Sequence, residues 1–346
     1  MRVGICGYPG SGKTTVFTAL APGANAGGKG GLVYGNIKVP DERVDALAAI
    51  FNPKKKTYAE ITFMDVGGSG RADTGAFPTE VVQNMRNADV LVHVVRAFDN
   101  PMLPTAPDPT RDEGMFNDEL ILLDLSLLER RRDRFRKENK KGLEVDTTER
   151  CVDHLEAGNA LRTLDLSEDD LNTFTGVQLL SVRPVITLYN LSEAGWAEPN
   201  NAPLKEMRER ERNHLSLGLC GSLEAEIASL DEADQREFLT GLGLNEPARY
   251  EFVRAAYRLL DLISFLTAGP DECRAWPIRR GTVARKAAGK IHSDIERGFI
   301  RAEIYRIDDM KKHKTEAALK AAGLMRLEGK DYVMQDGDVV NYRFNV

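Results

Sequence analysis

The sequence predicts an α/β protein built on a doubly wound, mostly parallel sheet, with a helical insert and a smaller α+β domain. Five apolar runs have the length and composition of buried parallel strands, and helix-like segments follow several of them. A glycine-rich loop follows the first run directly, and a helix-like segment follows the loop. The five runs are Arg2–Cys6, Ile61–Asp65, Val90–Val95, Val185–Tyr189 and Leu215–Leu219. Their alternation with helices is typical of a doubly wound domain.

Length and charge limit the possibilities further. The chain has 346 residues, of which 42% are apolar, so we expect two or three globular units with a substantial core. The formal net charge of −6 gives no general reason to expect nucleic-acid binding, and such a function would have to rest on one region. We expect a monomer.

Cysteine usage and the N-terminus indicate the compartment. Cys6, Cys151, Cys220 and Cys273 lie far apart and form no C-x-x-C pair, which argues against a zinc site and against a disulfide framework. The N-terminus lacks the basic flank and long apolar stretch of a signal peptide, and no run of 18 apolar residues occurs. We therefore expect a soluble, cytoplasmic protein that does not associate with membranes.

A helical hairpin is predicted between the third and fourth strands. Its first helix starts near Asn117 and carries Leu120, Leu123, Leu127 and Leu128 at helical spacing. Its second helix spans roughly Thr148 to Leu164, and the two are expected to pair antiparallel. The basic run that begins with Arg130, Arg131 and Arg132 lies at the tip, as a solvated helical face or as a binding surface.

After Leu262 the pattern becomes that of a small α+β domain. The expected strands are Cys273–Ile278, Phe299–Arg306, Tyr332–Met334 and Val339–Phe344, around a helix at Lys314–Ala322. Residues 273 to 301 hold eight Lys or Arg against two acids. The basic residues that define this candidate RNA-facing surface are Arg274, Arg279, Arg280, Arg285, Lys286 and Lys290. The same charges also fit a surface that balances the acidic stretch Glu224–Glu237.

The loop after the first strand matches a phosphate-binding motif. Gly7-Tyr8-Pro9-Gly10-Ser11-Gly12-Lys13-Thr14 fits G-x-x-x-x-G-K-[ST] between a strand and a helix, which is the context that this P-loop requires. Its glycines let backbone N–H groups turn toward a phosphate, and the helix adds the positive end of its dipole. Lys13 is expected to bridge β- and γ-phosphate oxygens, and the Thr14 hydroxyl to ligate Mg²⁺.

Two further segments complete the predicted site. Asp65-Val66-Gly67-Gly68 ends the second strand, where a carboxylate can reach the Mg²⁺ shell and a glycine N–H can sense the γ-phosphate. Asn190-Leu191-Ser192-Glu193 stands where guanine-binding proteins show N-K-x-D. Because Glu193 is one methylene longer than Asp and Leu191 replaces Lys, the acceptor geometry for guanine is displaced, and adenine is at least as good a candidate.

These motifs define a set of candidate residues. The predicted catalytic residues are Lys13, Asp65 and Gly68, and the predicted metal ligands are Thr14 and Asp65. The predicted nucleotide-binding residues are Gly7, Pro9, Gly10, Ser11, Gly12, Lys13, Thr14, Thr15, Asn190, Leu191 and Glu193. The glycine-rich segment Gly23–Gly31 is expected to be flexible.

With its motifs in this order, the chain resembles the YchF or Obg-like ATPase family of P-loop proteins. The resemblance extends over nearly the whole chain and includes Asp41–Leu47, Val94–Arg96, Leu161–Leu166, Ala287–Arg301, Glu328–Tyr332, Asp336–Asp338 and Phe344–Val346. It implies a P-loop G domain at residues 1–115 and 180–262, a helical hairpin at 116–179, and a TGS domain at 263–346. It also implies ATP preferred over GTP, Mg²⁺ as cofactor, and association with ribosomes.

Three departures from the family bear on turnover. The family's first switch segment, whose threonine completes the metal shell, has no counterpart between Gly31 and Pro40. After D-x-x-G the chain has Ser69 where the family has an apolar residue. The family's catalytic histidine has no counterpart, since residues 98–116 contain no His, and His93 lies inside the preceding strand. Catalysis would then rest on Lys13, backbone amides and Mg²⁺, so hydrolysis is expected to be slow or absent.

Three hypotheses follow from the sequence. The first is a slow ATPase that couples its nucleotide state to a ribosomal or RNA partner. The second is a nucleotide-gated interaction protein that does not hydrolyse, or a GTPase of the same architecture. The third is a small-molecule kinase with the arginines around Arg130–Arg136 in a lid, which the family resemblance of the C-terminal third argues against.

Overall fold

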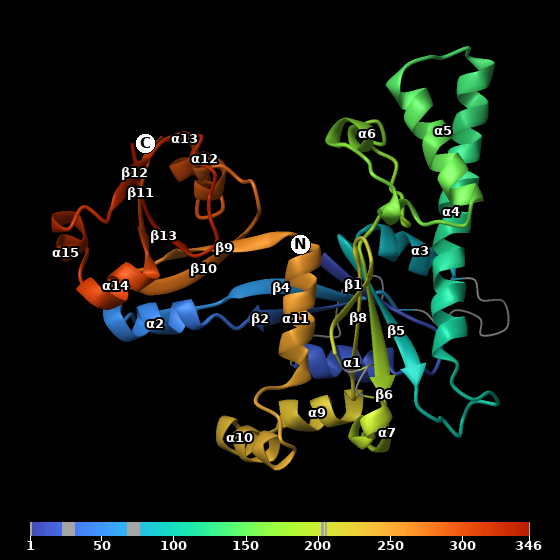
Figure 1. Cartoon of the computed structure of the whole chain (residues 1–346), viewed down its shortest axis with the longest axis horizontal. Coiled ribbons are helices and arrows are strands. Elements are labelled where there is room, and N and C mark those ends of the chain that lie inside the picture. The colour runs from blue at the N-terminus through green and yellow to red at the C-terminus, as the bar shows by residue number, and fades with distance from the viewer. Residues whose placement is uncertain (1, 23–31, 68–76, 202–203, 205, 346) are drawn as a thin grey trace. The chain divides into compact units, whose positions relative to one another are not determined.

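The computed structural model describes residues 2–22, 32–67, 77–201, 204 and 206–345 (Figure 1). The glycine-rich segment Gly23–Gly31, Gly68 and Ser69 lie outside this range. The chain forms two compact units. The first comprises residues 1–37 and 62–259, and the second comprises residues 38–61 and 260–346.

The first unit is centred on a seven-stranded sheet of order β2-β4-β1-β5-β6-β8-β7. The pairs β1–β4, β1–β5, β5–β6 and β6–β8 are parallel, and β7 runs antiparallel to its neighbour β8. The strands are β1 (Arg2–Cys6), β2 (Val33–Val39), β4 (Ala59–Asp65), β5 (Val90–Ala97), β6 (Val185–Leu191), β7 (Arg208–Glu211) and β8 (His214–Leu219). The predicted doubly wound, mostly parallel sheet is therefore confirmed, with β1 between β4 and β5 in its interior.

Helices cover both faces of this sheet because its strands are apolar on both sides. Met64 packs toward α3 and α4, whereas its neighbour Phe63 contacts Phe252 of α11 at a ring distance of 5.4 Å. The inner strands β1, β5, β6 and β8 are accordingly buried at every position except Arg2 and Ala97. The helices are α1 (Lys13–Leu20), α3 (Thr79–Arg86), α4 (Pro109–Lys137), α5 (Leu143–Glu156), α6 (Glu168–Asn172), α7 (Glu193–Ala197), α9 (Gly221–Ser229), α10 (Glu232–Gly241) and α11 (Ala248–Leu259), with single 3₁₀ turns at Leu161–Thr163 and Pro199–Asn201.

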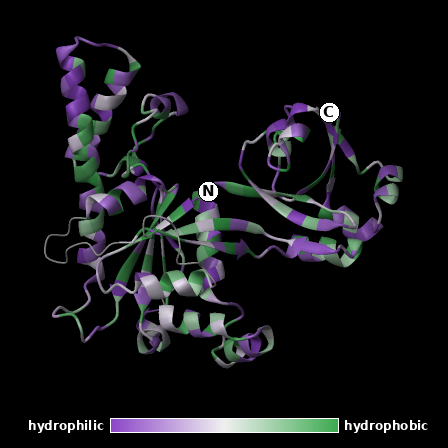
Figure 2. Ribbon diagram, turned by 180° about the vertical axis from the view of Figure 1, so that it is seen from behind, coloured by the Kyte–Doolittle hydropathy of each residue, from purple (hydrophilic) through white to green (hydrophobic). Residues whose placement is uncertain are grey.

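The predicted helical hairpin is present, but both of its helices start earlier than predicted. Helix α4 starts at Pro109 rather than near Asn117, because Asp108 caps it by accepting a hydrogen bond from Arg111 N and proline suits the first turn. Helix α5 starts at Leu143, not at Thr148, and ends at Glu156 before Gly158, whose positive φ of 79° ends the helix. The two helices pack through one apolar cluster, and their outer ends are hydrophilic (Figure 2).

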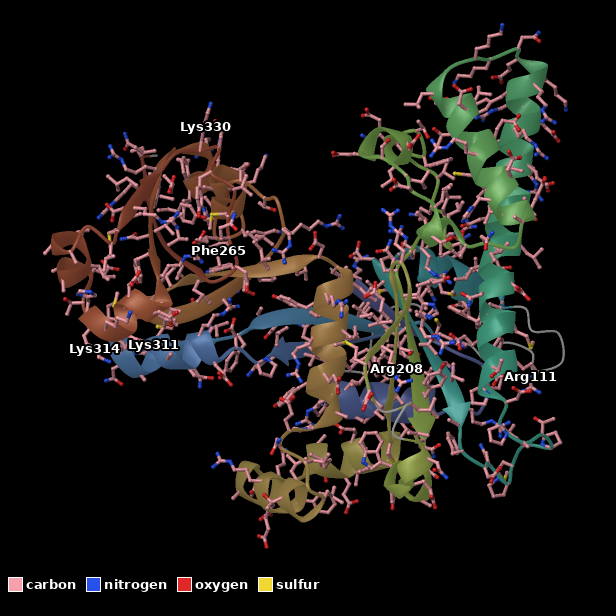
Figure 3. All side chains as sticks on the ribbon, viewed as in Figure 1. Arg111, Arg208, Phe265, Lys311, Lys314 and Lys330 are labelled. Carbon is pink, nitrogen blue, oxygen red and sulfur yellow. The ribbon has the colours of Figure 1, made fainter. Side chains whose placement is uncertain are left out.

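The second unit contains a six-stranded sheet of order β12-β11-β13-β9-β10-β3. Its strands are β3 (Lys55–Thr57), β9 (Leu262–Thr267), β10 (Glu272–Arg279), β11 (Phe299–Arg306), β12 (Arg326–Glu328) and β13 (Asp338–Phe344). Its helices are α2 (Glu42–Phe51), α12 (Ala284–Ala288), α13 (Ser293–Arg297), α14 (Ile307–His313) and α15 (Glu316–Ala321). Phe265 lies inside this unit, fully buried (Figure 3).

The second unit differs from the sequence prediction in three places. Tyr332–Met334 is not a strand and contributes one bridge, between Val333 and Val283. The helix predicted at Lys314–Ala322 is present as α15, and three further short helices, α12, α13 and α14, also follow residue 262. Lys314, with φ 63°, separates α14 from α15. The segment at residues 38–61, which lies far before residues 260–346 in the sequence, is also part of the unit.

Two general findings concern the whole described chain. Its four cysteines are buried and unbridged. In the described ranges, no helix combines the length and the apolar run needed to cross a membrane.

A buried carboxylate holds the hairpin helix against the segment that enters β6. Asp124 of α4 is fully buried and accepts hydrogen bonds from the backbone N–H groups of Leu180 and Ser181 and from the Ser181 hydroxyl, at 2.6 to 3.0 Å. Burial raises the pKa of Asp124, and these hydrogen bonds oppose that rise.

Asp124→Ala is therefore expected to lower the free energy of unfolding by about 3 kcal/mol, because three buried donors lose their acceptor. Asp118→Ala, an exposed position on the same helix, is the control and is expected to change it by less than about 0.5 kcal/mol. Denaturant unfolding measures both values. Equal effects of the two substitutions would contradict the assigned role of Asp124.

Candidate functional site

The phosphate-binding loop stands at the carboxyl end of β1, in the middle of the parallel sheet. Gly10 and Gly12 have φ angles of 75° and 83°, in the left-handed region that favours glycine. Gly12 is the N-cap of α1, so the backbone N–H groups of the first turn are left without helical acceptors. Lys13 opens the helix and is half-buried, with no hydrogen bond or ion pair given to its ammonium by the described residues. The loop is thus arranged as an anion cradle at a helix N-terminus.

Asn190 fixes the position of this cradle. Its side-chain amide donates to the Ser11 carbonyl at 2.9 Å and accepts from Gly221 N–H at 3.0 Å. Asn190 is buried at the end of β6, and a Cβ added to Gly12 would collide with its amide nitrogen. Both halves of the amide are therefore engaged within the protein, which gives Asn190 the role of positioning the loop rather than that of a free hydrogen-bonding group.

Leu191 and Glu193, the other members of the predicted base-reading segment, differ in exposure. Leu191 is buried as the last residue of β6. Glu193 is exposed in the first turn of α7, and its carboxylate accepts a hydrogen bond from the Ser222 hydroxyl at 3.2 Å. Of the three residues, only Glu193 presents a side chain to solvent.

Asp65 and Thr14 offer oxygen ligands of the kind that Mg²⁺ prefers. Asp65 ends β4, next to β1 in the sheet, and its carboxylate accepts from Gly67 N–H at 3.0 Å. Thr14 lies exposed in the first turn of α1, as does Thr15. A hydroxyl and one carboxylate beside a phosphate cradle fit the way proteins hold this ion, with nucleotide phosphates supplying further oxygens. Gly68, the last member of the predicted catalytic set, lies outside the described residues.

The loop that follows β5 covers the phosphate-binding loop, which the sequence did not reveal. Cβ atoms added to Gly10 and Gly12 would meet the side chains of Leu103 and Phe98, respectively. Arg96, buried at the end of β5, holds this covering loop by donating to the carbonyls of Thr105 and Ala106 at 2.8 and 3.1 Å. A charged residue inside an otherwise apolar strand was the signal that could have drawn attention to Arg96.

His93 is a packed core residue, as expected from its place inside the strand. It is fully buried, stacks on Phe116 at 4.1 Å and meets Tyr8 edge-on at 5.8 Å. Neither ring nitrogen has a hydrogen-bond partner among the described residues. Burial lowers the pKa of His93 to about 3, so the imidazole is neutral at physiological pH.

Comparison with known proteins agrees with this architecture. The family model YchF-GTPase_C, described as a protein of unknown function (DUF933), matches residues 262–345. The "Ribosome-binding ATPase YchF" of Pasteurella multocida is 37% identical over the whole chain and 99% of its own length. That of Bacillus subtilis is 34% identical over the full length of both. The chain belongs to the YchF family.

Solved structures place the fold in the same family. The Schizosaccharomyces pombe YchF GTPase matches 99% of this chain with a TM-score of 0.87 and 28% identity, and 97% of that protein is covered. A GTP binding protein from Pyrococcus horikoshii matches the full length of both chains with a TM-score of 0.62 at 19% identity, which speaks for the fold alone. The YchF resemblance stated from the motifs is thus confirmed, as is the P-loop G-domain fold.

The buried imidazole makes the stability of this YchF-family protein sensitive to acid. The pKa of His93 is about 3 in the folded state and about 6.5 in an unfolded chain, so between these values only the unfolded chain takes up the proton. The free energy of unfolding should therefore fall as the pH drops below 6.5, by up to about 1.4 kcal/mol per pH unit from this residue.

Phenylalanine at position 93 removes that proton-binding group and forfeits no hydrogen bond given by the described residues. We expect the free energy of unfolding of His93→Phe to fall less steeply than that of the wild type between pH 7.5 and pH 5. Denaturant unfolding across this range measures the two slopes. Parallel slopes would show that His93 is not the buried neutral group described here.

Proposed function

We propose that this protein binds Mg²⁺–ATP in the cytoplasm, hydrolyses it slowly, and associates with ribosomes or RNA. The observation that carries the proposal is the phosphate-binding loop, whose left-handed glycines, helix N-terminus and half-buried Lys13 are held in place by Asn190. The relatives from Pasteurella multocida and Bacillus subtilis are named as ribosome-binding ATPases, which supports both the nucleotide and the ribosome part of the proposal.

Slow hydrolysis is expected because the side chains next to Gly10 of the phosphate-binding loop are poor at activating a water molecule. Leu103, the side chain over this glycine, is apolar and can neither orient a water molecule nor take its proton. Asn100 also lies near Gly10, but its amide is a weak base, and its oxygen accepts a hydrogen bond from Met102 N–H. Among the described residues, transition-state stabilisation would then fall to Lys13 and the loop amides, with a Mg²⁺ ion that Thr14 and Asp65 would hold. A nucleotide-gated binder that does not hydrolyse is the second candidate, and the same surroundings favour it.

The choice of ATP over GTP rests on the end of β6. Asn190 has both halves of its amide engaged, Leu191 is buried, and Glu193 is held by the Ser222 hydroxyl. The carboxylate that would have to read guanine N1–H and N2–H₂ is therefore longer than aspartate and already has a partner. Because the Schizosaccharomyces pombe relative is named a GTPase, GTP is the competing nucleotide to test.

Calorimetric titration with non-hydrolysable ATP and GTP analogues in Mg²⁺ tests the nucleotide half. ATP is expected to bind at least about tenfold more tightly than GTP, a difference of about 1.4 kcal/mol. Lys13→Ala should weaken binding on the order of 10²-fold, because a charged hydrogen bond to phosphate is lost. Lys54→Ala, at an exposed lysine paired with Asp271, should change nothing.

Tighter GTP binding would make the protein a GTPase of this architecture, and wild-type affinity in Lys13→Ala would overturn the assignment of the loop. Phosphate release on the natural nucleotides then separates a slow ATPase from a binder that does not hydrolyse.

The basic surface of the second unit is the better candidate for the ribosome contact. At the hairpin tip, the Arg131 guanidinium lies over Phe135 and Phe174 and donates to the Thr173 carbonyl at 2.7 Å, and Arg132 pairs with Glu156 at 3.3 Å. These two arginines therefore serve the hairpin itself, and Arg130 is the exposed one of the three.

In the second unit, several cations remain exposed. Arg279 and Lys290 are exposed and have no ion pair with a described residue. Arg280 pairs with Asp261, Lys286 pairs with Glu296, and Arg285 donates to a backbone carbonyl, while all three stay solvent-accessible. Arg274 lies over the ring of Trp276 at 4.0 Å, which gives this surface an aromatic face beside its charges.

Arg279→Glu with Lys290→Glu in the full chain is therefore expected to weaken co-sedimentation with ribosomes and to lower its salt dependence, because two phosphate contacts are lost. Lys311→Glu with Lys312→Glu makes the same charge change on α14 of the same unit and serves as the control. Equal loss in both variants would indicate a general charge effect. No loss in the first would move the contact to the hairpin or exclude it.

A further inference from the structure

Ser222 and Glu193 form an exposed polar pair at the carboxyl ends of two neighbouring strands. Glu193 opens α7, two residues after the end of β6, and Ser222 lies in the first turn of α9, which follows β8 (Figure 1). Strands β6 and β8 are paired in parallel. The Ser222 hydroxyl donates to the Glu193 carboxylate at 3.2 Å, and both side chains are exposed. A ligand at this edge of the sheet can therefore reach both groups.

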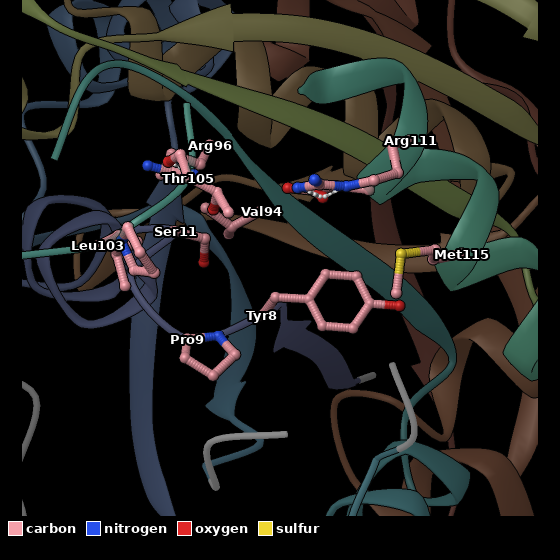
Figure 4. Close-up of a pocket in the computed structure, with 11 residues that line it drawn as sticks. Tyr8, Pro9, Ser11, Val94, Arg96, Leu103, Thr105, Arg111 and Met115 are labelled. Atoms are coloured by element: carbon pink, nitrogen blue, oxygen red, sulfur yellow. Dashed lines mark hydrogen bonds and ion pairs between the residues drawn. The ribbon is translucent and has the colours of Figure 1, made fainter. Parts of the chain in front are cut away.

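The pair stands beside the phosphate-binding loop. Asn190 donates to the carbonyl of Ser11, a residue of that loop (Figure 4), and accepts from Gly221 N–H at the start of α9. A Cβ added to Gly221 would lie 3.2 Å from the Val16 side chain of α1, so the start of α9 adjoins the helix that follows the loop. A nucleotide whose phosphates occupy the loop extends along the carboxyl ends of the strands, which brings its base toward α7 and α9.

The hydroxyl of Ser222 is committed as a donor within the pair. A carboxylate accepts hydrogen bonds and donates none, so the hydroxyl proton is directed at Glu193. The Cys220 sulfur lies 3.2 Å from the same hydroxyl oxygen, and its S–H is then the donor of that contact. A hydroxyl oxygen has two lone pairs, and the described residues offer no donor to the second. Ser222 therefore presents an acceptor, and no donor, to a ligand.

This hydrogen-bonding state distinguishes the two purine bases. At position 6 adenine carries an amino group, which donates, whereas guanine carries a carbonyl oxygen, which accepts. A hydroxyl that can only accept pairs with the amino group and leaves the guanine oxygen without a partner. We propose that Ser222, oriented by Glu193, selects adenine by accepting a hydrogen bond from its 6-amino group. This role rests on the proposed binding of an adenine nucleotide and names the residue that recognises its base.

The test is calorimetric titration of the full chain in Mg²⁺ with ADP and with purine riboside 5′-diphosphate, which lacks the 6-amino group and is otherwise identical. Diphosphates are used because they carry no γ-phosphate to be hydrolysed. ADP is expected to bind about fivefold more tightly than the amine-free nucleotide, which corresponds to one neutral hydrogen bond. Ser222→Ala removes this difference. Ser229→Ala, at an exposed serine in the last turn of the same helix, leaves it unchanged.

Glu193→Ala separates the two members of the pair. In this variant the Ser222 hydroxyl still accepts, so the preference for ADP over purine riboside diphosphate is retained. The hydroxyl proton has lost its carboxylate and is free to donate to the guanine oxygen, so the preference for ADP over GDP falls at least about threefold. A retained amine preference in Ser222→Ala would overturn the proposal, and its loss in Glu193→Ala would do the same by making Glu193 the acceptor.

Two results in the wild-type protein distinguish a failure of this role from a failure of the proposed function. Equal affinity for ADP and purine riboside diphosphate overturns the role of Ser222 and leaves nucleotide binding at the phosphate-binding loop intact. Absent binding of ADP, GDP and purine riboside diphosphate overturns the nucleotide assignment and the role of Ser222 with it.

Discussion

The candidate site depends on one buried amide. Asn190 ties the Ser11 carbonyl of the phosphate-binding loop to the Gly221 N–H that opens α9, and so joins the ends of β1, β6 and β8. A loop with two left-handed glycines has many alternative conformations, and ordering it costs more entropy than ordering most segments. The amide reduces that cost by holding the loop at a fixed place on a rigid sheet, which is the condition for preorganised phosphate binding.

Three buried polar side chains of the first unit, Asp124, His93 and Arg96, are compensated in different ways. Asp124 keeps a buried carboxyl because backbone N–H groups and a hydroxyl surround it. His93 keeps a buried ring because it stays neutral between Phe116 and Tyr8. Arg96 is always charged and has only one of its terminal nitrogens satisfied by described residues, which makes it the least compensated of the three. The same low-polarity surroundings thus hold a hydrogen-bonded carboxyl, a neutral packed ring and a partly compensated cation.

The sequence allowed the sheet and the phosphate-binding loop to be predicted, because both depend on local pattern. Apolar runs such as Val185–Tyr189 and the spacing of Gly7, Gly12 and Lys13 carry their structural meaning within a few residues. The covering loop did not follow from the sequence, since Leu103 and Phe98 meet Gly10 and Gly12 only after β5 and β1 have paired. The start of α4 was also missed, although Asp108-Pro109 is a local capping signal. The role of Asn190 required tertiary contacts, because the same residue type at a strand end also suits direct base recognition.

The division of the chain into units constrains how the C-terminal third can be separated from the rest. Strand β3 (Lys55–Thr57) pairs with β10 (Glu272–Arg279). In the sequence, however, β3 comes before β4 and β5, which belong to the sheet of the first unit. A chain that ended at residue 262 would keep β3 and α2 but lose β10, the strand with which β3 pairs and which α2 contacts. Such a fragment would expose backbone donors and acceptors that pair readily with other chains, so poor solubility in it would report an unpaired sheet edge and not the loss of a binding surface.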